Sequence, residues 1–436
     1  MKSLNVGLLG IGTVGGGTFS VLKRNAALIS RRAGRPIRIV QVADKNLALA
    51  REVTGGKVEL TDDAFALVAN PEIDVVVELI GGYGVAKDLV LAAIANGKHV
   101  VTANKALLAV HGNEIFAAAR ARGVIVAFEA AVAGGIPIIK ALREGLTANR
   151  IQWIAGIING TTNFILSEMR DKGISFAAAL GEAQRLGYAE SDPTFDIEGI
   201  DAAHKITILS ALAFGIPMQF HRAYVEGISK LEADDIKYAE QLGYRIKLLG
   251  IAKWQVGGVE LRVHPTLIPA RRLIANVEGA MNAILVQADA VGSTMYYGKG
   301  AGAEPTASAV IADLVDVARL HTASPEHRVP SLAFQPDAVK DTSVMPIADI
   351  ESGYYLRLRV EDKRGVLADI TRILADQQIS IDAMIQREPG EGESQTDIIM
   401  LTHVTKEKFV DAAIAKIEAL SVVTQKVVRL RMEELG

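Results

Sequence analysis

A glycine-rich turn near the amino terminus constrains the fold of this chain more than any other feature of its sequence. The segment 10–15, Gly-Ile-Gly-Thr-Val-Gly, directly follows an apolar run at 4–9 that is typical of a buried strand. In such a setting Gly10 permits a tight turn, Gly12 lets a pyrophosphate approach the backbone, and Gly15 lets a helix lie close to the strand. The N–H groups at the start of that helix would face the anion. The turn therefore predicts a dinucleotide site formed by Gly10, Gly12, Thr13, Val14 and Gly15.

Strand-like and helix-like segments alternate through the first third of the chain. Further strands are predicted at 37–43, 74–80, 99–102 and 123–128, with helices at 14–30 and 85–96. This alternation is typical of a parallel sheet covered by helices on both faces. We therefore expect an α/β fold, with a doubly wound Rossmann sheet over residues 1–135.

The pattern changes after the Gly-Gly-Ile-Pro segment at 134–137. Residues 136–304 combine long helices with strands at 151–157 and 258–265, which predicts an α+β domain. By fold analogy this domain is expected to bind the substrate and to form a dimer. A helix at 305–320 is expected to return to the first domain, and the proline-rich residues 321–351 are expected to form a linker. Residues 352–436 predict the order β-α-β-β-α-β of a ferredoxin-like unit, with strands at 354–360, 379–386, 396–403 and 422–429 and a polar hairpin around 388–395.

Composition narrows both the compartment and the chemistry. The 436 residues carry a formal net charge of −3 and include no cysteine. That balance gives no general attraction to nucleic acid or to an anionic membrane. The sequence shows no membrane-length apolar run and no signal peptide, so we expect a cytoplasmic protein. Without cysteine the chain cannot use the thiolate nucleophile of an acylating aldehyde dehydrogenase.

The end of the second predicted strand bears on the choice of cofactor. An acidic residue at this place would bind the ribose 2′-hydroxyl of NAD, whereas a basic one would accept the 2′-phosphate of NADP. Asp44 favours the first and Lys45 the second. An ordinary surface pair in a turn is the third interpretation, and the sequence leaves the choice open.

Four further segments follow the glycine turn along the chain. They are Thr-Ala-Asn-Lys at 102–105, Glu-Ala-Ala-Val-Ala-Gly-Gly-Ile-Pro at 129–137, the run 156–166, and Gly-Tyr-Ala-Glu-Ser-Asp-Pro at 187–193 with its continuation to Lys205. In this order they resemble homoserine dehydrogenases. Together with the glycine turn, the resemblance covers residues 1 to about 320, and the Asn-Gly-Thr-Thr-Asn segment at 159–163 is its most specific part. The tail resembles an ACT domain, as in the longer bacterial members of that family. The resemblance implies an NAD(P)-dependent oxidoreductase that interconverts L-aspartate 4-semialdehyde and L-homoserine in threonine and methionine biosynthesis.

Asp201 and Lys205 stand four residues apart on a predicted helix at 199–214 that is apolar around nearly its whole circumference. Such a helix encloses an ion pair that would otherwise be solvated, and enclosed charges are often functional. The resemblance implies that Lys205 exchanges the proton of the substrate's C4 oxygen and that Lys105 lies near the nicotinamide and the substrate. It also implies that Glu190 and Asp201 hold the substrate, that Thr102 lines the cofactor site, and that Gly302 lies in a second glycine turn over the cofactor. That turn could equally be a hinge.

The acidic loop before this helix has two interpretations. Glu190 and Asp196 could hold the ammonium of an amino-acid substrate, whereas Asp196 could equally cap the helix. The loop therefore supplies candidate substrate-binding residues without deciding between them.

The resemblance also implies a monovalent cation, Na⁺ or K⁺, bound by backbone carbonyls of the segment at 129–137. A plain glycine turn would explain the same residues, and the ion would be structural rather than catalytic. The candidate ligands are Glu129, Val132, Gly134 and Ile136.

The ACT-like tail is predicted to be a sensor. Asp362, Gly365 and Val366 lie at its first strand–helix turn, where backbone N–H groups could receive an amino-acid carboxylate. Family analogy makes threonine the expected effector and a homodimer or homotetramer the expected assembly. Two alternatives remain: another amino-acid or 2-hydroxy-acid dehydrogenase on the same fold, and a catalytically silent amino-acid sensor.

Overall fold

The computed structural model describes residues 2–387, 389 and 392–436, and the contacts within it divide the chain into two units. The first unit comprises residues 1–160, 201–223 and 280–342. The second comprises residues 161–200, 224–279 and 343–436. Part of the expected hairpin around 388–395 lies outside the described residues. Among the described helices, none is both long and apolar enough to cross a membrane.

A parallel six-stranded sheet organises the first unit. Its strand order is β3-β2-β1-β4-β5-β6, so β1 pairs with β2 on one side and with β4 on the other. The chain order reverses between β1 and β4, and doubly wound sheets bind ligands outside the carboxyl ends of the strands at such a point. The predicted fold class is confirmed. The strands are β1 (Leu4–Leu9), β2 (Ile37–Ala43), β3 (Glu59–Thr61), β4 (Val75–Glu78), β5 (His99–Thr102) and β6 (Val126–Ala127).

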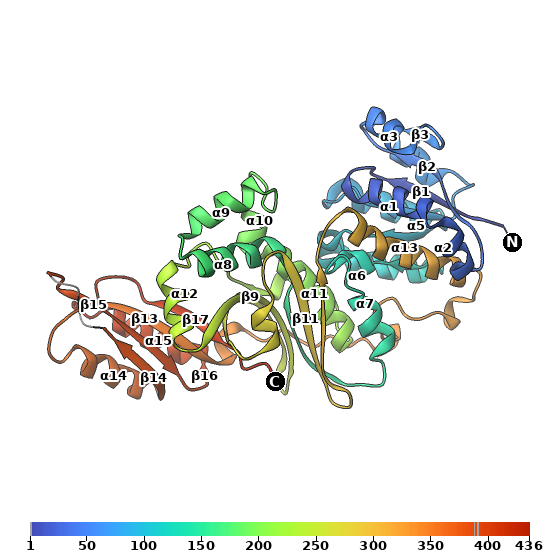
Figure 1. The fold of residues 1–436 in the computed structure, drawn as a ribbon. Coiled ribbons are helices and arrows are strands. Elements are labelled where there is room, and N and C mark those ends of the chain that lie inside the picture. The colour runs from blue at the N-terminus through green and yellow to red at the C-terminus, as the bar shows by residue number, and fades with distance from the viewer. Residues whose placement is uncertain (1, 388, 390–391) are drawn as a thin grey trace. The chain divides into compact units, whose positions relative to one another are not determined.

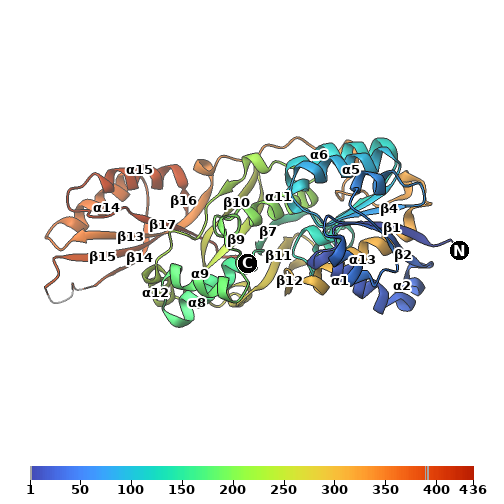
Figure 2. The same cartoon turned by 90° about the horizontal axis from the view of Figure 1, so that it is seen from above.

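Helices cover both faces of this sheet (Figure 2). One face carries α1 (Thr13–Arg24), α2 (Ala26–Ala33) and α13 (Ala303–Leu320), and the other carries α4 (Ala64–Ala69), α5 (Gly84–Ala95) and α6 (Lys105–Arg122); α3 (Leu47–Thr54) joins β2 to β3. The late helix α13 thus shares a core with the first helix. Their approach is so close that a Cβ on Gly17 would lie 2.5 Å from the Ala303 carbonyl oxygen.

The single helix predicted at 14–30 is wrong. Asn25 ends α1 with φ −105° and ψ 15°, donates its backbone N–H to Val21, and is followed at once by α2. Asparagine competes with helical hydrogen bonding and tolerates such turns, which is the physical reason for the break.

The first unit also contains three antiparallel strands in the order β12-β11-β7. The strand predicted at 151–157 is confirmed as β7 (Ile151–Ile157), and the hairpin of β11 (Met281–Ala288) and β12 (Gly292–Lys299) was not predicted. The buried helix α11 (Ile200–Phe214) belongs to this unit from Asp201 onward. The shorter elements are η1 (Glu129–Ala131), α7 (Ile138–Lys140), η2 (Ala141–Gly145), η3 (Phe220–Arg222), η5 (Pro325–His327) and η6 (Pro336–Ala338).

The second unit combines helices from the middle of the chain with one sheet in the order β9-β10-β17-β13-β15-β14. The middle of the chain contributes α8 (Gly160–Lys172), α9 (Phe176–Arg185), α10 (Thr194–Ile197), β8 (Tyr224–Val225), α12 (Ala233–Gln241), β9 (Tyr244–Gln255), β10 (Gly258–Pro269) and η4 (Leu273–Asn276). The tail contributes η7 (Ile347–Asp349), β13 (Glu351–Glu361), α14 (Val366–Asp376), β14 (Ile381–Gln386), β15 (Gln395–Thr402), β16 (Thr405–Lys406), α15 (Glu407–Glu418) and β17 (Val428–Met432). Figure 1 labels the strands of the tail and its helices α14 and α15.

The β-α-β-β-α-β order of the tail is confirmed, with α14 and α15 packed on its sheet. The last strand, however, runs over 428–432 rather than the predicted 422–429. Arginines at 429 and 431 look like an end to the strand in the sequence, yet Arg431 is 1% exposed and is paired with Glu407 at 2.5 Å.

The tail is joined to the middle of the chain through this strand. β17 pairs in parallel with β10 and antiparallel with β13, so one sheet continues across both. Beyond β17, the carboxylate of Glu433 binds the fully buried Arg262 of β10 at 2.5 Å. The proline-rich linker suggested a detached domain, but a linker says nothing about which sheet edge the chain joins later.

Candidate active site

The glycine turn at the end of β1 has the geometry of a dinucleotide-binding loop. Gly10 adopts φ +92°, and a Cβ on Gly15 would lie 2.1 Å from the Gly10 carbonyl oxygen, so both positions require glycine. A Cβ on Gly12 would meet nothing within 4 Å, and Gly12 and Thr13 are exposed. The turn therefore leaves open space beside the first residues of α1, where a pyrophosphate would bind the helix N-terminus.

Asp44, at the end of β2, is engaged by the same turn. One carboxylate oxygen accepts the Ile11 N–H at 2.7 Å, and the other accepts the Asn46 N–H at 2.8 Å. Lys45 beside it is exposed. The carboxylate that was predicted to bind a ribose therefore also holds the glycine turn in place.

Asp201 is the centre of the candidate catalytic cluster. Its carboxylate binds the Lys205 ammonium at 2.6 Å through one oxygen and lies 3.2 Å from the Lys105 ammonium through the other. Asn159 donates a further hydrogen bond to it at 2.9 Å. Burial alone would raise the pKa of Asp201, but the two ammonium groups and the hydrogen bonds hold that pKa well below its usual range. The acid is ionised and bridges two lysines that lie far apart in the sequence.

The sequence reading that Asp201 and Lys205 are enclosed is confirmed. The side chain of Asp201 is 5% exposed and that of Lys205 is 11% exposed, whereas that of Lys105 is 34% exposed. Lys205 also donates to the Ile158 carbonyl at 2.7 Å. The ammonium of Lys205 is thus fixed from two sides by the strand–helix junction at 158–159 and by Asp201.

Lys105 lies at the carboxyl edge of the parallel sheet. It is the first residue of α6, whose N-cap Asn104 accepts the Leu107 N–H at 3.0 Å and donates to the Gly82 carbonyl at 2.8 Å. Thr102, the last residue of β5, donates its hydroxyl to the buried Glu78 at 2.6 Å. These bonds tie the loops after β4 and β5 together.

An aromatic and imidazole cluster adjoins the lysines. Tyr83 lies in the loop after β4, and its hydroxyl is 3.4 Å from Nε2 of the buried His204, the residue before Lys205. Burial, with smaller contributions from the two lysines, lowers the pKa of His204 to about 4 against the opposing effect of Asp201. His204 is therefore neutral near pH 7 and adds no third positive charge beside Asp201.

The acidic loop that carries Glu190 and Asp196 belongs to the second unit. Glu190 is exposed, and Asp196 lies inside α10. The following helix, α11, begins at Ile200 after Gly199 with φ +80°, so Asp196 lies four residues before its first residue. The Asp196 carbonyl accepts the Gly199 N–H at 3.0 Å.

Two cavities lie away from these residues. One, of about 370 Å³, lies between α6 and the segment 325–339 in the first unit, and Phe116, Val329 and Phe334 line it. The other, of about 580 Å³, lies between α15, β17 and the segment 226–232 in the second unit. Neither cavity is lined by a residue predicted from the sequence to belong to the site.

Comparison with known proteins assigns the arrangement to a family. The family profile described as homoserine dehydrogenase matches residues 137–315, its NAD-binding domain matches residues 10–129, and the ACT domain matches residues 354–422. A homoserine dehydrogenase from Pseudomonas aeruginosa is 62% identical over 436 residues, which is 100% of both chains. The structure of a homoserine dehydrogenase from Thiobacillus denitrificans is 70% identical, with a TM-score of 0.96 over 100% of this chain and 99% of that one. The chain belongs to the homoserine dehydrogenase family.

The protein is therefore an NAD(P)-dependent oxidoreductase with an ACT regulatory domain. A more distant relative, a hyperthermophilic archaeal homoserine dehydrogenase in complex with NADPH, is 26% identical, with a TM-score of 0.63 over 74% of this chain and 99% of that one. The cofactor half of this homoserine dehydrogenase is the Rossmann sheet described above.

In this homoserine dehydrogenase the segment 129–137 is almost wholly buried. Glu129, Val132, Gly134 and Ile136 are each buried, and the turn between them has φ +55° at Ala133 and +47° at Gly134. The carboxylate of Glu129 accepts the N–H groups of Ile139 and Lys140, while its own N–H donates to Asp313 at 2.7 Å. Within the described residues no group of three His, Asp or Glu side chains is arranged to hold a metal ion.

Two buried carboxylates adjoin that segment. Burial, together with Asp313, raises the pKa of Glu129 to about 7, and burial raises the pKa of Asp313 to about 6. The second oxygen of Asp313 has no hydrogen-bond partner among the described residues. A hard cation bound by nearby carbonyls is compatible with this excess of buried acid.

The predicted effector residues lie at the turn between β13 and α14. Gly365 adopts φ +92° as the residue before α14, and a Cβ on it would meet nothing within 4 Å. Asp362 is exposed and donates its N–H to the Ser394 carbonyl at 2.9 Å. The turn is open in front of the first residues of an eleven-residue helix.

Sequence reasoning missed three members of the catalytic cluster. Asn159 was quoted as part of a motif but not as a site residue, and the contributions of Glu78 and His204 were not considered. A signal was available for Glu78, since a charged residue ends an otherwise apolar strand at the carboxyl edge of the sheet. For His204 the signal was its position next to Lys205 on a helix that is otherwise apolar.

Proposed function

We propose that Lys205 is the acid–base group of the homoserine dehydrogenase reaction and that Lys105 and Asp201 hold it and the substrate in place. The observation that carries the proposal is the Asp201 carboxylate, buried and shared between the Lys205 and Lys105 ammonium groups at 2.6 and 3.2 Å. A positioned proton donor or acceptor of this kind typically contributes 10²–10⁴-fold to a rate.

The reaction interconverts L-homoserine and L-aspartate 4-semialdehyde. When bound, the nicotinamide cofactor supplies hydride transfer at C4. Lys205 takes the proton of the homoserine hydroxyl during oxidation and returns it during reduction of the semialdehyde. Glu190, Asp196 and Asp201 are proposed as substrate-binding residues, the first two as candidates for the substrate ammonium. Reduction toward threonine and methionine is the proposed physiological direction.

Both NAD and NADP are proposed as cofactors. Gly10, Gly12, Thr13, Val14 and Gly15 would bind the pyrophosphate, and Thr102 and Gly302 would line the rest of the site. The NADPH complex of the archaeal relative supports the phosphorylated form. Asp44 and the exposed Lys45 support opposite preferences, and Asp44 is partly occupied by Ile11.

A structural Na⁺ or K⁺ is proposed at the backbone carbonyls of Glu129, Val132, Gly134 and Ile136. The burial of all four residues and the unpartnered oxygen of Asp313 support a positive charge there. The ion would hold the segment that leads into α7 and would take no part in the chemistry.

The ACT domain is proposed to bind threonine and thereby to lower activity. Asp362, Gly365 and Val366 offer an open helix N-terminus for a carboxylate. Effector coupling is typically ~1–3 kcal/mol, because threonine must bind one state of the enzyme better than another. Gly365→Val should weaken inhibition by threonine and leave kcat in its absence unchanged. Inhibition curves for the variant and the unaltered enzyme that coincide would rule out this turn as the effector site.

Removing the tail would not be a clean test of regulation. A chain ending near Pro336 would lose β17, expose the edge of β10 and leave the buried Arg262 without Glu433. Breaking one partner from a buried ion pair typically costs ~3–5 kcal/mol. Point substitutions in the turn are therefore the sharper experiment.

The assembly is proposed to be a homodimer or homotetramer, which sedimentation of the purified protein would measure. The function itself is tested by following the absorbance of NADH and NADPH with L-aspartate 4-semialdehyde, and of NAD and NADP with L-homoserine. Turnover of other carbonyl compounds in preference to these two would favour a different dehydrogenase, and no turnover of any would favour a silent sensor.

A further inference from the structure

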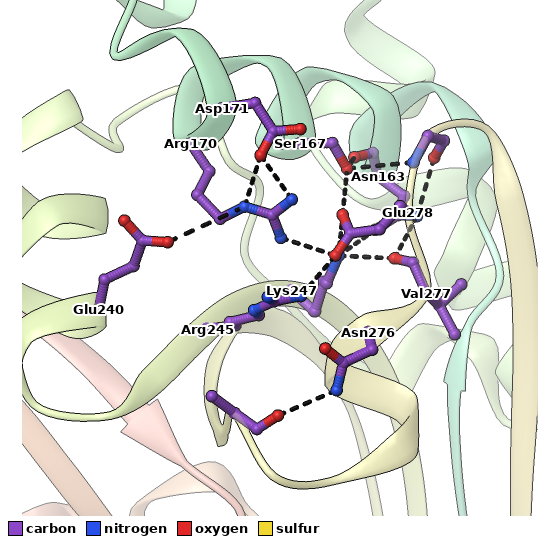
Figure 3. A network of polar contacts seen from close by, with 12 residues as sticks. Asn163, Ser167, Arg170, Asp171, Glu240, Arg245, Lys247, Asn276, Val277 and Glu278 are labelled. Carbon is purple, nitrogen blue, oxygen red and sulfur yellow. Dashed lines mark hydrogen bonds and ion pairs between the residues drawn. The ribbon is translucent and has the colours of Figure 1, made fainter.

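A second cationic cluster lies in the second unit, around the carboxylate of Glu278 (Figure 3). Arg170 and Arg245 donate to one of its oxygens at 2.7 and 2.6 Å, and Ser167 donates to the other at 3.0 Å. The Lys247 ammonium lies 3.4 Å from that second oxygen. Most of these residues come from two elements, α8 and β9, that the loop carrying Glu278 ties together.

Lys247 is a buried lysine whose hydrogen bonds reach the start of α8. Its side chain is 2% exposed, and its ammonium donates to the Val277 carbonyl at 2.6 Å and to the Asn163 side-chain oxygen at 3.1 Å. The amide nitrogen of Asn163 in turn donates to the carbonyls of Val277 and Gly279 at 3.0 and 2.8 Å. Figure 3 draws these contacts among Asn163, Lys247, Val277 and Glu278. Lys247 therefore fixes the loop and the side chain that rests on it at the same time.

The same loop limits where α8 can begin. A Cβ on Gly160, the first residue of α8, would lie 2.7 Å from the carbonyl oxygen of Ala280, the residue after Gly279. The first turn of α8 thus contacts residues 277–280 at two points. The backbone of Gly160 lies close to Ala280, and the Asn163 side chain donates hydrogen bonds to the carbonyls of Val277 and Gly279. A shift of the loop must move this turn.

The residues immediately before Gly160 hold the catalytic pair. The Ile158 carbonyl accepts a hydrogen bond from Lys205 at 2.7 Å, and Asn159 donates to Asp201 at 2.9 Å. The junction between β7 and α8 therefore binds Lys205 through Ile158, and it is followed directly by the α8 turn that packs on the loop 277–280. Asn159 is bonded directly to Gly160, the first residue of the α8 turn that packs on the loop 277–280.

We propose that Lys247 and Glu278 are positioning residues for the dehydrogenase reaction. They hold the loop 277–280 against the first turn of α8, and this fixes the direction in which Ile158 and Asn159 present their hydrogen bonds to Lys205 and Asp201. The inference rests on the proposed role of Lys205. Lys247 itself does not touch substrate or cofactor.

The test is Lys247→Met, which keeps the length of the side chain and removes its charge and donors. We expect kcat per bound-cofactor site for homoserine oxidation to fall roughly 10- to 100-fold, the effect of a displacement of about 1 Å at a reacting group. The dissociation constant for NADPH should stay unchanged, and the pH profile of kcat should shift because the Asp201–Lys205 geometry has changed. A purely structural role would lower the amount of folded enzyme and leave kcat per cofactor site and the pH profile as they were.

Lys253→Met is the matched control. Lys253 stands six residues further along β9, on the same face of the strand, and its ammonium binds Glu433 at 2.5 Å. Among the described residues Lys253 makes no hydrogen bond or ion pair with α8, so its loss should leave kcat per cofactor site unchanged. Equal losses of kcat in both variants would overturn the proposal.

Glu278→Gln is a second variant, which tests the proposal if Lys247→Met does not fold. The Glu278 side chain is 37% exposed, so the glutamine remains solvated, and the same direction of change in kcat is expected. If the unaltered enzyme does not oxidise homoserine at all, the proposed function fails. If it does, and both Lys247→Met and Glu278→Gln keep its kcat per cofactor site, the positioning role fails.

Discussion

Asp201 in the first unit and Glu278 in the second each bind several cations, but burial is distributed in opposite ways. At Asp201 the carboxylate is buried, with a side chain 5% exposed, and one of its lysines, Lys105, stays 34% exposed. At Glu278 the carboxylate is 37% exposed and the lysine is 2% exposed. In the first cluster the acid is buried and one of its lysines is partly exposed. In the second cluster the lysine is buried and the acid is partly exposed.

The difference separates two uses of the same charges. Burial lowers the pKa of Lys247 to about 8 despite Glu278, because its desolvation is only partly offset. The pKa of Asp201, by contrast, is held low against burial by two ammonium groups. Lys205 and Lys105, 11% and 34% exposed, share one ionised carboxylate, whereas the buried Lys247 uses its donors on the Val277 carbonyl and the Asn163 side-chain oxygen.

Lys205→Ala gives the largest effect expected from the Asp201 cluster. We expect kcat to fall roughly 10²–10⁴-fold, the usual scale for losing a general acid–base group, with nearly unchanged dinucleotide binding. Steady-state kinetics in both directions and a cofactor titration measure the two quantities. The control is Lys172→Ala, which removes an i,i+4 ion pair with Glu168 on an exposed helix face. Near-normal turnover in Lys205→Ala would make the Asp201–Lys205 pair structural.

The Glu278 cluster should show itself in stability at alkaline pH. The pKa of Lys247 in the folded protein, about 8, lies below its ordinary value of 10.5. Between these values the unfolded chain binds more protons, so the free energy of unfolding rises with pH relative to Lys247→Met, by on the order of 2 kcal/mol across the window. This contribution is complete above 10.5 and is lost as the pH falls through 8. Urea unfolding of both proteins at several pH values measures it, and parallel curves would show that Lys247 titrates normally.

The sheet of the first unit could be predicted because short apolar runs and the glycine turn determine it locally. β1, β2 and β5 have the expected bounds. The break at Asn25 and the helix α6 were missed, since a helix with buried residues spread around it shows little periodicity. The predicted bounds of β17 were wrong because its buried arginine at 431 depends on partners such as Glu407, which lies elsewhere in the sequence.

The candidate site was predictable only where its members are close in sequence. The Asp201–Lys205 pair follows from helical spacing on an apolar helix. The link from Asp201 to Lys105 and the hydrogen bond from Asn159 come from the tertiary fold, and no spacing rule contains them. Asp44 shows the opposite case. Its position in the sequence suggested a ribose ligand, but its carboxylate also accepts a hydrogen bond from the Ile11 N–H within the fold.

Lys45 extends the comparison to a lysine that is exposed and stands beside a carboxylate already engaged by backbone. Lys45→Ala should raise KM for NADPH several-fold and leave KM for NADH nearly unchanged, because only the former carries a 2′-phosphate. An exposed ammonium acts through a screened field, so the difference between the two cofactors should shrink as salt is added. Lys57→Ala, another exposed lysine of the same domain, is the control and should change neither KM. Equal changes for NADH and NADPH in Lys45→Ala would mean that Lys45 does not meet the 2′-phosphate, and cofactor choice would then depend on the turn that Asp44 holds.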